Sequence, residues 1–291
     1  MRNLMCNLFR SSSLVLMCLV AFCLSACMSV QVSENQFIHP DSRSGYRLAE
    51  KLDAASVQQM AANAELTEWR LDSSDGVTLQ GIRIQLKQAQ VSVLYFGGNM
   101  FHLDDGAKYL LPAMQQCGVN LLSFDYRGYG RSSGQPNVAN MQADALRIYD
   151  YARAQTTGKL IVHGQSLGSF IAGYVAQHRQ LDGLVLESTA SNAMDWALAN
   201  TPWYAKAFVT IELSPALQGI DNTRAVAGFR GKSLVLVGDQ DQVTPLALGR
   251  KVYDALPSAD KRFMVSPGGG HNGLMRRTDM VDAYCGFVRS I

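Results

Sequence analysis

Short runs of apolar residues alternate with segments of helical periodicity through most of this sequence. The apolar runs are Val91–Phe96, Val119–Phe124, Leu160–His163, Gly183–Leu186, Leu234–Val237 and Arg262–Val265, and the helical segments are Phe101–Cys117, Val138–Gln155, Leu167–Gln180, Pro245–Leu256 and Asn272–Arg289. Strands that are apolar along their whole length are typical of a parallel sheet covered by helices on both faces. The sequence therefore predicts an α/β fold with a mostly parallel central sheet.

The regions outside this alternation suggest how the chain is divided. Trp69–Leu71 and Val77–Leu86 flank Asp75-Gly76, which predicts a hairpin at the start of a main domain over residues 67–291. Residues 27–66 form a polar spacer with one helix-like stretch, Glu50–Leu66. Residues 189–230 interrupt the strand–helix rhythm and are rich in aromatic side chains. We expect this insertion to be a small cap over a site, with an extra packing helix as the alternative.

The charge of the chain is balanced once its first residues are set aside. The formal net charge is +2, from 26 basic and 24 acidic residues. Arg2 and Arg10 lie in residues 1–26, which contain no acidic residue, so the remaining chain is neutral. Phosphate binding needs a basic face, so nucleic acid is not an expected partner. A hydrophobic content of 47% also argues against disorder.

The first residues have the pattern of an export signal. Two arginines in Met1–Arg10 precede the mostly apolar run Leu14–Ala26. This run is shorter than the ~20 residues that span a bilayer as a helix. A basic start, a short apolar centre and small residues at its end indicate a secretory signal peptide over residues 1–26. A retained signal anchor is the alternative.

The strongest chemical motif is Gly164-Gln165-Ser166-Leu167-Gly168. It follows a predicted strand and opens a predicted helix, which is the setting of a nucleophile elbow. Such a turn presents a serine hydroxyl above the edge of the sheet, and the helix N-terminus supplies donors where an oxyanion forms. We therefore expect Ser166 to be a nucleophile and the backbone N–H of Leu167 to be one oxyanion donor.

A serine nucleophile needs a base that is oriented by a third group. In this type of fold the chain order is serine, acid, histidine. His271 lies in the glycine-rich loop after the last strand and follows the elbow helix, so it is the predicted base. Asp239 and Asp241 both follow Leu234–Val237 and are the candidate acids. The second oxyanion donor should come from Gly97-Gly98-Asn99, after the strand Val91–Phe96.

Six cysteines are present, of which Cys117 and Cys285 lie in the main domain. Pairing needs Cα atoms within ~7 Å, which a sequence does not reveal. We expect two buried free thiols, with a disulfide as the alternative. No Cys/His spacing suggests a zinc site, and neither a metal nor an organic cofactor is expected.

Together these motifs resemble the α/β-hydrolase superfamily from about Glu68 to the end of the chain. Asp125-Tyr-Arg-Gly-Tyr-Gly-Arg-Ser132 and the elbow look like the BEM46-like and ABHD-type serine hydrolases. The resemblance implies Asp241 as the triad acid, with Asp239 stabilising the loop, and Asn99 as the second oxyanion donor. It also implies that Asp125 and Arg127 brace the neighbouring loop Phe96–Asn99 and carry no proton. One departure is Phe96-Gly97-Gly98-Asn99, where those relatives have His-Gly-Asn.

A second resemblance concerns Leu24-Ser25-Ala26-Cys27, which is similar to the lipobox of bacterial lipoproteins. It implies cleavage before Cys27 and acylation of Cys27, and two or more acyl chains anchor a protein stably to a membrane. Met28, where aspartate would favour inner-membrane retention, implies the periplasmic face of the outer membrane.

These observations predict a lipid-anchored serine hydrolase of the cell envelope. It would cleave a carboxylic ester or thioester through an acyl-enzyme on Ser166, and its small-molecule or lipid substrate would carry a hydrophobic acyl group. The alternatives are a serine peptidase or amidase of the same fold and a non-catalytic binding lipoprotein.

Overall fold

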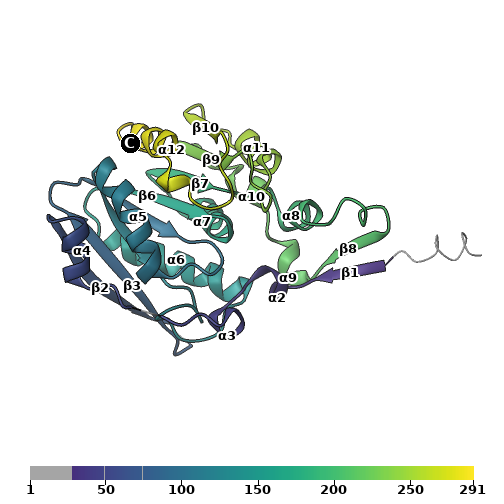
Figure 1. The fold of residues 1–291 in the computed structure, drawn as a ribbon, viewed down its shortest axis with the longest axis horizontal. Helices are drawn as coiled ribbons and strands as arrows, with labels where there is room; N and C mark the ends of the chain where they lie inside the picture. Colours follow the sequence, from purple (N-terminus) through teal and green to yellow (C-terminus); the bar gives the residue numbers. More distant parts are fainter. Residues whose placement is uncertain (1–27, 49, 74) are drawn as a thin grey trace, which may run out of the picture.

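A computed structural model describes residues 28–48, 50–73 and 75–291. Its centre is a sheet of eight strands in the order β10-β9-β7-β6-β4-β5-β3-β2 (Figure 1). The strands are β1 (Met28–Val32), β2 (Ala64–Asp72), β3 (Thr78–Leu86), β4 (Val91–Phe96), β5 (Val119–Phe124), β6 (Lys159–Gln165), β7 (Gly183–Glu187), β8 (Val209–Leu213), β9 (Ser233–Gly238) and β10 (Lys261–Ser266). From β5 to β10 all neighbours are parallel, and β3 pairs antiparallel with both β5 and β2. The predicted fold class and the β2–β3 hairpin are confirmed.

Helices connect these strands on both sides of the sheet. They are α2 (Glu34–Phe37), α3 (Asp41–Ser44), α4 (Ala54–Met60), α5 (Leu103–Cys117), α6 (Val138–Ala154), α7 (Leu167–His178), α8 (Ala193–Ala199), α9 (Pro215–Gln218), α10 (Asn222–Val226), α11 (Leu246–Ala255) and α12 (Thr278–Val288), with the 3₁₀ turn η1 (Leu274–Arg276). Among the described residues, no helix is both long and apolar enough to cross a bilayer.

Two hydrophobic cores lie on opposite faces of the sheet. Because successive strand side chains point to opposite faces, Leu94 and Leu122 join one core while Val93 and Leu121 join the other. The first core is closed by α6, α7, α10 and α11, and the second by α4, α5 and α12. Burial on both faces explains why the central strands are apolar along their whole length.

Two helix predictions differ from the structure. Only Ala54–Met60 of the predicted stretch Glu50–Leu66 is helical, and β2 begins at Ala64. The last residues of that stretch belong to the edge strand β2, because Ala64–Asp72 pair along the whole of β3. The last helix begins at Thr278, not at Asn272, because Gly273 has a left-handed φ of 92° and a 3₁₀ turn follows it.

The N-terminal segment is joined to the insertion at residues 189–230. Strand β1 pairs in parallel with β8 of the insertion, and this two-stranded sheet projects away from the central sheet (Figure 1). The side chain of Phe37 on α2 is buried and packs against Phe170 of α7 and Trp196 of α8. Residues that precede the main domain in sequence therefore pack beside the elbow helix.

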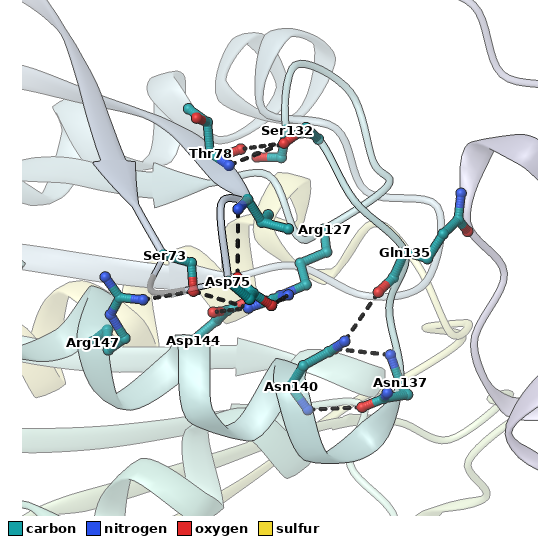
Figure 2. Close-up of polar contacts among 12 residues, drawn as sticks. Ser73, Asp75, Thr78, Arg127, Ser132, Gln135, Asn137, Asn140, Asp144 and Arg147 are labelled. Atoms are coloured by element: carbon teal, nitrogen blue, oxygen red, sulfur yellow. Dashed lines mark hydrogen bonds and ion pairs between the residues drawn. The ribbon is translucent and has the colours of Figure 1, made fainter.

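The loop after β5 is held by buried ion pairs. Figure 2 shows the guanidinium of Arg127 between Asp75, in the β2–β3 turn, and Asp144 of α6, which accepts from Arg127 Nη2 at 2.9 Å. Ser73 accepts from Arg127 Nη2 at 3.1 Å and also from Arg147 Nη1 at 2.6 Å. This network joins the hairpin turn to α6, so Arg127 holds these elements together and not the loop Phe96–Asn99 that it was expected to brace.

Asp125 braces the same loop from inside. Its two carboxylate oxygens accept from the backbone N–H groups of Leu103 and Arg131, each at 2.8 Å. Burial raises the pKa of Asp125 to about 7, against the lowering effect of these two hydrogen bonds. Both oxygens are thus occupied by the backbone of the start of α5 and of the loop.

The expectation of two free thiols is wrong. Cys117, at the end of α5, and Cys285, on α12, form a disulfide with a Cα–Cα distance of 4.7 Å. The two helices pack on the same face of the sheet, so residues separated by 168 positions become neighbours. The disulfide closes a very long loop, and disulfides persist mainly in oxidising compartments.

Candidate active site

Ser166 lies in a strained turn between β6 and α7. Its φ of 52° and ψ of −116° are rare for a residue with a side chain. The glycines on either side make the turn possible: a Cβ on Gly164 would lie 2.2 Å from the carbonyl oxygen of Gly168, and one on Gly168 would lie 2.0 Å from that of Phe96. Neither flanking position has room for a side chain. The motif forms the expected elbow because both positions are glycines.

Hydrogen bonds to the backbone N–H and carbonyl groups of Ser166 hold this turn in place. The Ser166 N–H donates to the carbonyl oxygen of Glu187 at the end of β7, at 2.9 Å. The Ser166 carbonyl oxygen accepts from the backbone and the hydroxyl of Ser169, at 2.9 and 2.6 Å. Leu167 is the first residue of α7, and a helix leaves its first N–H groups without intrahelical acceptors. That N–H group is therefore available to a ligand.

His271 reaches the serine from the loop between β10 and η1. Its Nε2 lies 2.8 Å from Oγ of Ser166. The Ser188 hydroxyl donates to the His271 carbonyl oxygen at 2.8 Å, which holds the backbone of this loop. The loop is close-packed as well as glycine-rich, because a Cβ on Gly238 would lie 2.2 Å from the carbonyl oxygen of Gly269.

Asp241 contacts the other ring nitrogen of His271, Nδ1. His271 Nδ1 lies 2.9 and 3.1 Å from its two carboxylate oxygens, and the Asp241 side chain is fully buried. Burial alone raises the pKa of Asp241, but hydrogen bonds from His271 and Thr244 together outweigh it and leave the pKa below its ordinary value. Asp241 therefore remains a carboxylate that accepts the proton of Nδ1, which leaves the lone pair of Nε2 facing the serine. The alternative acid, Asp239, accepts from the Gly268 N–H at 2.7 Å and stabilises the loop.

Thr244 is a residue of the site that the sequence reasoning missed. Its N–H donates to Asp241 Oδ1 at 2.8 Å, and its hydroxyl lies 2.7 Å from Asp241 Oδ2 and 3.2 Å from His271 Nδ1. The hydroxyl also lies 2.9 Å from the Ser188 carbonyl oxygen. The only available signal was its place three residues after Asp241 in the same loop, which fits an Asx-type turn.

The loop after β4 brings Asn99 beside the elbow. Among the described residues, no protein acceptor takes the backbone N–H of Asn99, whereas both its side-chain oxygen and its side-chain nitrogen make hydrogen bonds. The side-chain amide donates to the Phe37 carbonyl oxygen at 2.7 Å, and its oxygen accepts from the His39 N–H and the Tyr129 hydroxyl, each at 2.9 Å. Asn99 thus secures the N-terminal segment while its backbone lines the pocket.

A pocket of about 300 Å³ opens above these groups and is called here the catalytic pocket. Ser166, His271, Asn99 and Leu167 all line it. Its other walls are mainly apolar, and they come from the N-terminal segment, α7, the insertion and the loop after β9: Phe37, Met100, Phe170, Trp196 and Val243. The sequence did not predict that Phe37 and His39, from the expected spacer, would line the same pocket as the serine.

The chain of hydroxyl, imidazole and carboxylate is the arrangement that activates a serine for nucleophilic attack. Within the ranges that the structure describes, no group of three or more His, Cys, Asp or Glu residues is placed to hold a metal ion. Cys27, the predicted lipidation site, and the predicted signal peptide lie outside the described residues.

Fold and site together define the class of structure: the chain has the α/β-hydrolase fold. Residues 88–226 match the family model described as "Serine aminopeptidase, S33". In structure, an esterase of Pyrococcus furiosus aligns over 88% of this chain and 98% of its own, with a TM-score of 0.66 at 15% identity. An acetyl xylan esterase from Paenibacillus sp. R4 covers 79% of this chain and 85% of its own, with a TM-score of 0.64 at 15% identity.

Two relatives in sequence match part of the chain. The α/β hydrolase domain-containing protein aho-3 of Caenorhabditis elegans is 28% identical over 194 residues, which are 65% of this chain and 54% of that protein. An uncharacterised protein of Mycobacterium tuberculosis is 29% identical over 184 residues, 62% of this chain and 63% of its own. The match thus spans between half and two thirds of these relatives' own length.

Proposed function

We propose that this protein is a serine hydrolase that cleaves carboxylic esters or thioesters through an acyl-enzyme on Ser166. The observation that carries the proposal is the hydrogen-bonded chain from Ser166 Oγ through His271 to Asp241, at 2.8 and 2.9 Å, inside an apolar pocket.

In the first half-reaction, Oγ of Ser166 attacks the substrate carbonyl carbon while its proton passes to Nε2 of His271. The backbone N–H groups of Leu167 and Asn99 stabilise the resulting oxyanion, and one such donor contributes about 2.7–4 kcal/mol to lowering the barrier. His271 then protonates the leaving oxygen or sulfur as its bond to the carbonyl carbon breaks. Asp241 stays ionised and holds the imidazolium.

In the second half-reaction, water replaces the leaving group. It gives a proton to His271 and attacks the acyl carbon, and the collapse of the second oxyanion returns the proton to Ser166. Phe37, Phe170 and Trp196 line the pocket that receives the acyl chain, which supports a hydrophobic acyl group as substrate. Burial of each methylene contributes about 0.8 kcal/mol to binding.

We further propose that the protein is exported and anchored by acyl groups on Cys27 at the periplasmic face of the outer membrane. The Cys117–Cys285 disulfide supports an oxidising compartment. The residue after Cys27, Met28, pairs with Val209 and donates its N–H to the Phe208 carbonyl oxygen. Trp203, Tyr204 and Phe208, called here the aromatic loop, have exposed fractions of 84%, 64% and 56%. Trp and Tyr are favoured at membrane interfaces.

Amide cleavage is the second candidate, since the matching family model is described as a serine aminopeptidase. A panel of p-nitrophenyl esters of increasing chain length, alongside p-nitroanilides with the same acyl groups, separates the two candidates. We expect ester cleavage to dominate and to improve beyond acetyl. Activity restricted to the shortest esters would contradict the hydrophobic acyl group, and faster cleavage of the anilides would favour the amidase.

The nucleophile is tested independently with a fluorophosphonate probe, which labels activated serines. Wild-type protein should be labelled, and Ser166→Ala should not. Ser133→Ala, which removes an exposed serine that does not line the catalytic pocket, is the matched control and should retain labelling. Absence of labelling in the wild type would favour a non-catalytic binding protein.

A further inference from the structure

A second and larger chamber, of about 590 Å³, lies beside the catalytic pocket. We propose that it binds a leaving group that carries an ammonium ion, so that the substrate is an ester of a cationic alcohol. This inference deepens the proposed function and rests on it. The groups that carry it, here called the acidic chamber, are two carboxylates and four aromatic rings: Asp105, Glu187, Tyr46, Tyr95, Phe101 and Tyr109.

The acidic chamber is next to the reacting groups. It shares Asn99, Met100, Gln165 and Asn272 with the catalytic pocket. Gln165 immediately precedes the proposed nucleophile, Asn272 follows the proposed base, and Asn99 is the proposed oxyanion donor. An ester carbonyl held at the oxyanion donors therefore has one pocket for each of its two ends.

The chemistry of the walls decides which end lies in which pocket. The catalytic pocket is lined by Phe37, Phe170 and Trp196 and contains no carboxylate among its described lining residues. The acidic chamber contains two carboxylates and, among its described lining residues, no Lys or Arg, while its histidine, His102, is paired with Asp41 at 2.7 Å. An apolar acyl chain is accordingly favoured in the first pocket and a cationic alcohol in the second.

Glu187 is the charged group at the inner end of the chamber. It ends β7, its residue is only 2% exposed, and its backbone carbonyl oxygen accepts the Ser166 N–H. Carboxylate Oε2 lies 3.0 Å from Nε2 of His163. The Nδ1 atom of His163 is buried and has no hydrogen-bond partner among the described residues.

The contact with His163 uses one of the two carboxylate oxygens of Glu187. Among the described residues, its second oxygen, Oε1, makes no hydrogen bond with a side chain or backbone. A buried charge is costly unless it is paired. Arg276 packs on the ring of Tyr109 at 4.3 Å but is not one of the chamber's lining residues. A cation in the chamber would supply the missing partner.

The aromatic walls suit the same ligand. An ammonium group over aromatic faces gains cation–π stabilisation, which is larger at sites shielded from water. The Tyr109 hydroxyl is buried without a partner among the described residues, and its pKa is raised to about 12 by burial first and by the charge of Glu187 second. Tyr46 donates its hydroxyl to Asp105 at 2.8 Å, which fixes one ring at the rim.

The first test measures binding and does not depend on catalysis. Choline and 3,3-dimethylbutanol have nearly the same shape and differ in charge, so calorimetric titration of Ser166→Ala protein with each isolates the charge effect. We expect choline to bind at least about tenfold more tightly. In the Ser166→Ala background, Glu187→Gln should remove most of this difference, and Asp105→Asn, at the exposed rim, should reduce it less. Glu65→Gln, an exposed glutamate on β2, is the matched control.

The second test measures turnover of butyrylcholine and 3,3-dimethylbutyl butyrate. Wild-type protein should favour the choline ester in kcat/KM, and Glu187→Gln should lower the ratio of the two values by about tenfold. The proposal that the chamber binds a cation would be wrong if the two esters were cleaved with equal efficiency, or if choline bound no better than its neutral analogue. Neither result would contradict the proposal that the protein is a serine hydrolase. Selective choline binding without any ester hydrolysis would instead overturn the proposed function alone.

An α-ammonium group on the acyl side is the competing source of the same charge. Aminoacyl p-nitrophenyl esters and their N-acetylated counterparts test it, because acetylation removes the charge. We expect no preference for the free amine. A preference for it that is lost in Glu187→Gln would overturn the assignment of the chamber to the leaving group. If Glu187→Gln does not fold, as judged by its thermal melt, the wild-type choline preference and Asp105→Asn decide the question.

Discussion

Nε2 of His271 lies 2.8 Å from Oγ of Ser166, although 105 positions separate the two residues in the chain. The contact depends on three loops that meet at the carboxyl ends of β6, β9 and β10. Asp241 and Thr244 leave β9, His271 leaves β10, and Ser166 leaves β6. Because these strands are parallel, their carboxyl ends share one edge of the sheet, so short loops are enough to bring the groups together.

Thr244 is predicted to act as a positioning residue for Asp241 and His271. Thr244→Val removes the hydroxyl that lies between the carboxylate, the imidazole and the Ser188 carbonyl oxygen. We expect kcat to fall by about tenfold with little change in KM, because one hydrogen bond that orients the base is lost. Thr244→Ser should restore most of kcat, and equal losses in both variants would contradict this role.

Asp241→Asn is predicted to lower kcat by about 10³–10⁴-fold, since the imidazole would lose its orientation and tautomer. Asp241 also makes stability depend on pH. Its pKa in the folded protein lies below the ordinary value of 3.8, so its contribution is complete above pH 3.8 and is lost as the pH falls through the folded pKa.

The measurement is the difference in melting temperature between wild type and Asp241→Asn from pH 3 to pH 8. We expect a constant difference above about pH 5 and a shrinking one below pH 3.8. A difference that already grows as the pH falls from 7 to 5 would show that the pKa of Asp241 is raised, not lowered.

The Cys117–Cys285 disulfide is predicted to stabilise the fold. Replacing both cysteines by alanine should lower the free energy of unfolding by about 2–4 kcal/mol, because the bond restricts the unfolded chain over a long loop. Denaturant titration with and without reductant measures the change. Reductant should destabilise the wild type and leave the double variant unaffected, whereas an unchanged wild-type midpoint would argue that the bond contributes nothing.

The aromatic loop is predicted to contact the membrane when the full chain is anchored in vesicles. Trp203 is 84% exposed, whereas Trp69 and Trp196 pack against the core. Brominated lipids should therefore quench a large part of the tryptophan fluorescence, and Trp203→Phe should abolish that part. Quenching that is the same in both proteins would place the loop away from the bilayer.

Much of the fold followed from local patterns. The central strands were predicted nearly to the residue, because burial on both faces of a parallel sheet leaves a continuous apolar run. The turn of the hairpin was also predicted, but only Trp69–Leu71 of β2, which runs from Ala64 to Asp72. The elbow was equally local, since Gly164 and Gly168 are needed within two positions of Ser166. Periodicity was a weaker guide at the edge of the sheet. The stretch before β2 was assigned to a helix because Ala64 becomes a strand residue only by pairing with Leu86, which a local pattern does not reveal.

The sequence by itself determined the α/β class, the order of serine, acid and histidine candidates, and the turn that exposes Ser166, because each depends on backbone sterics or side-chain periodicity over a few neighbouring residues. Only the tertiary structure decided that Cys117 bonds Cys285, that Phe37 lines the pocket of Ser166, and that Glu187 lines an adjoining chamber. Those features arise where helices and loops distant in the chain pack together, and no local pattern encodes the distance between them.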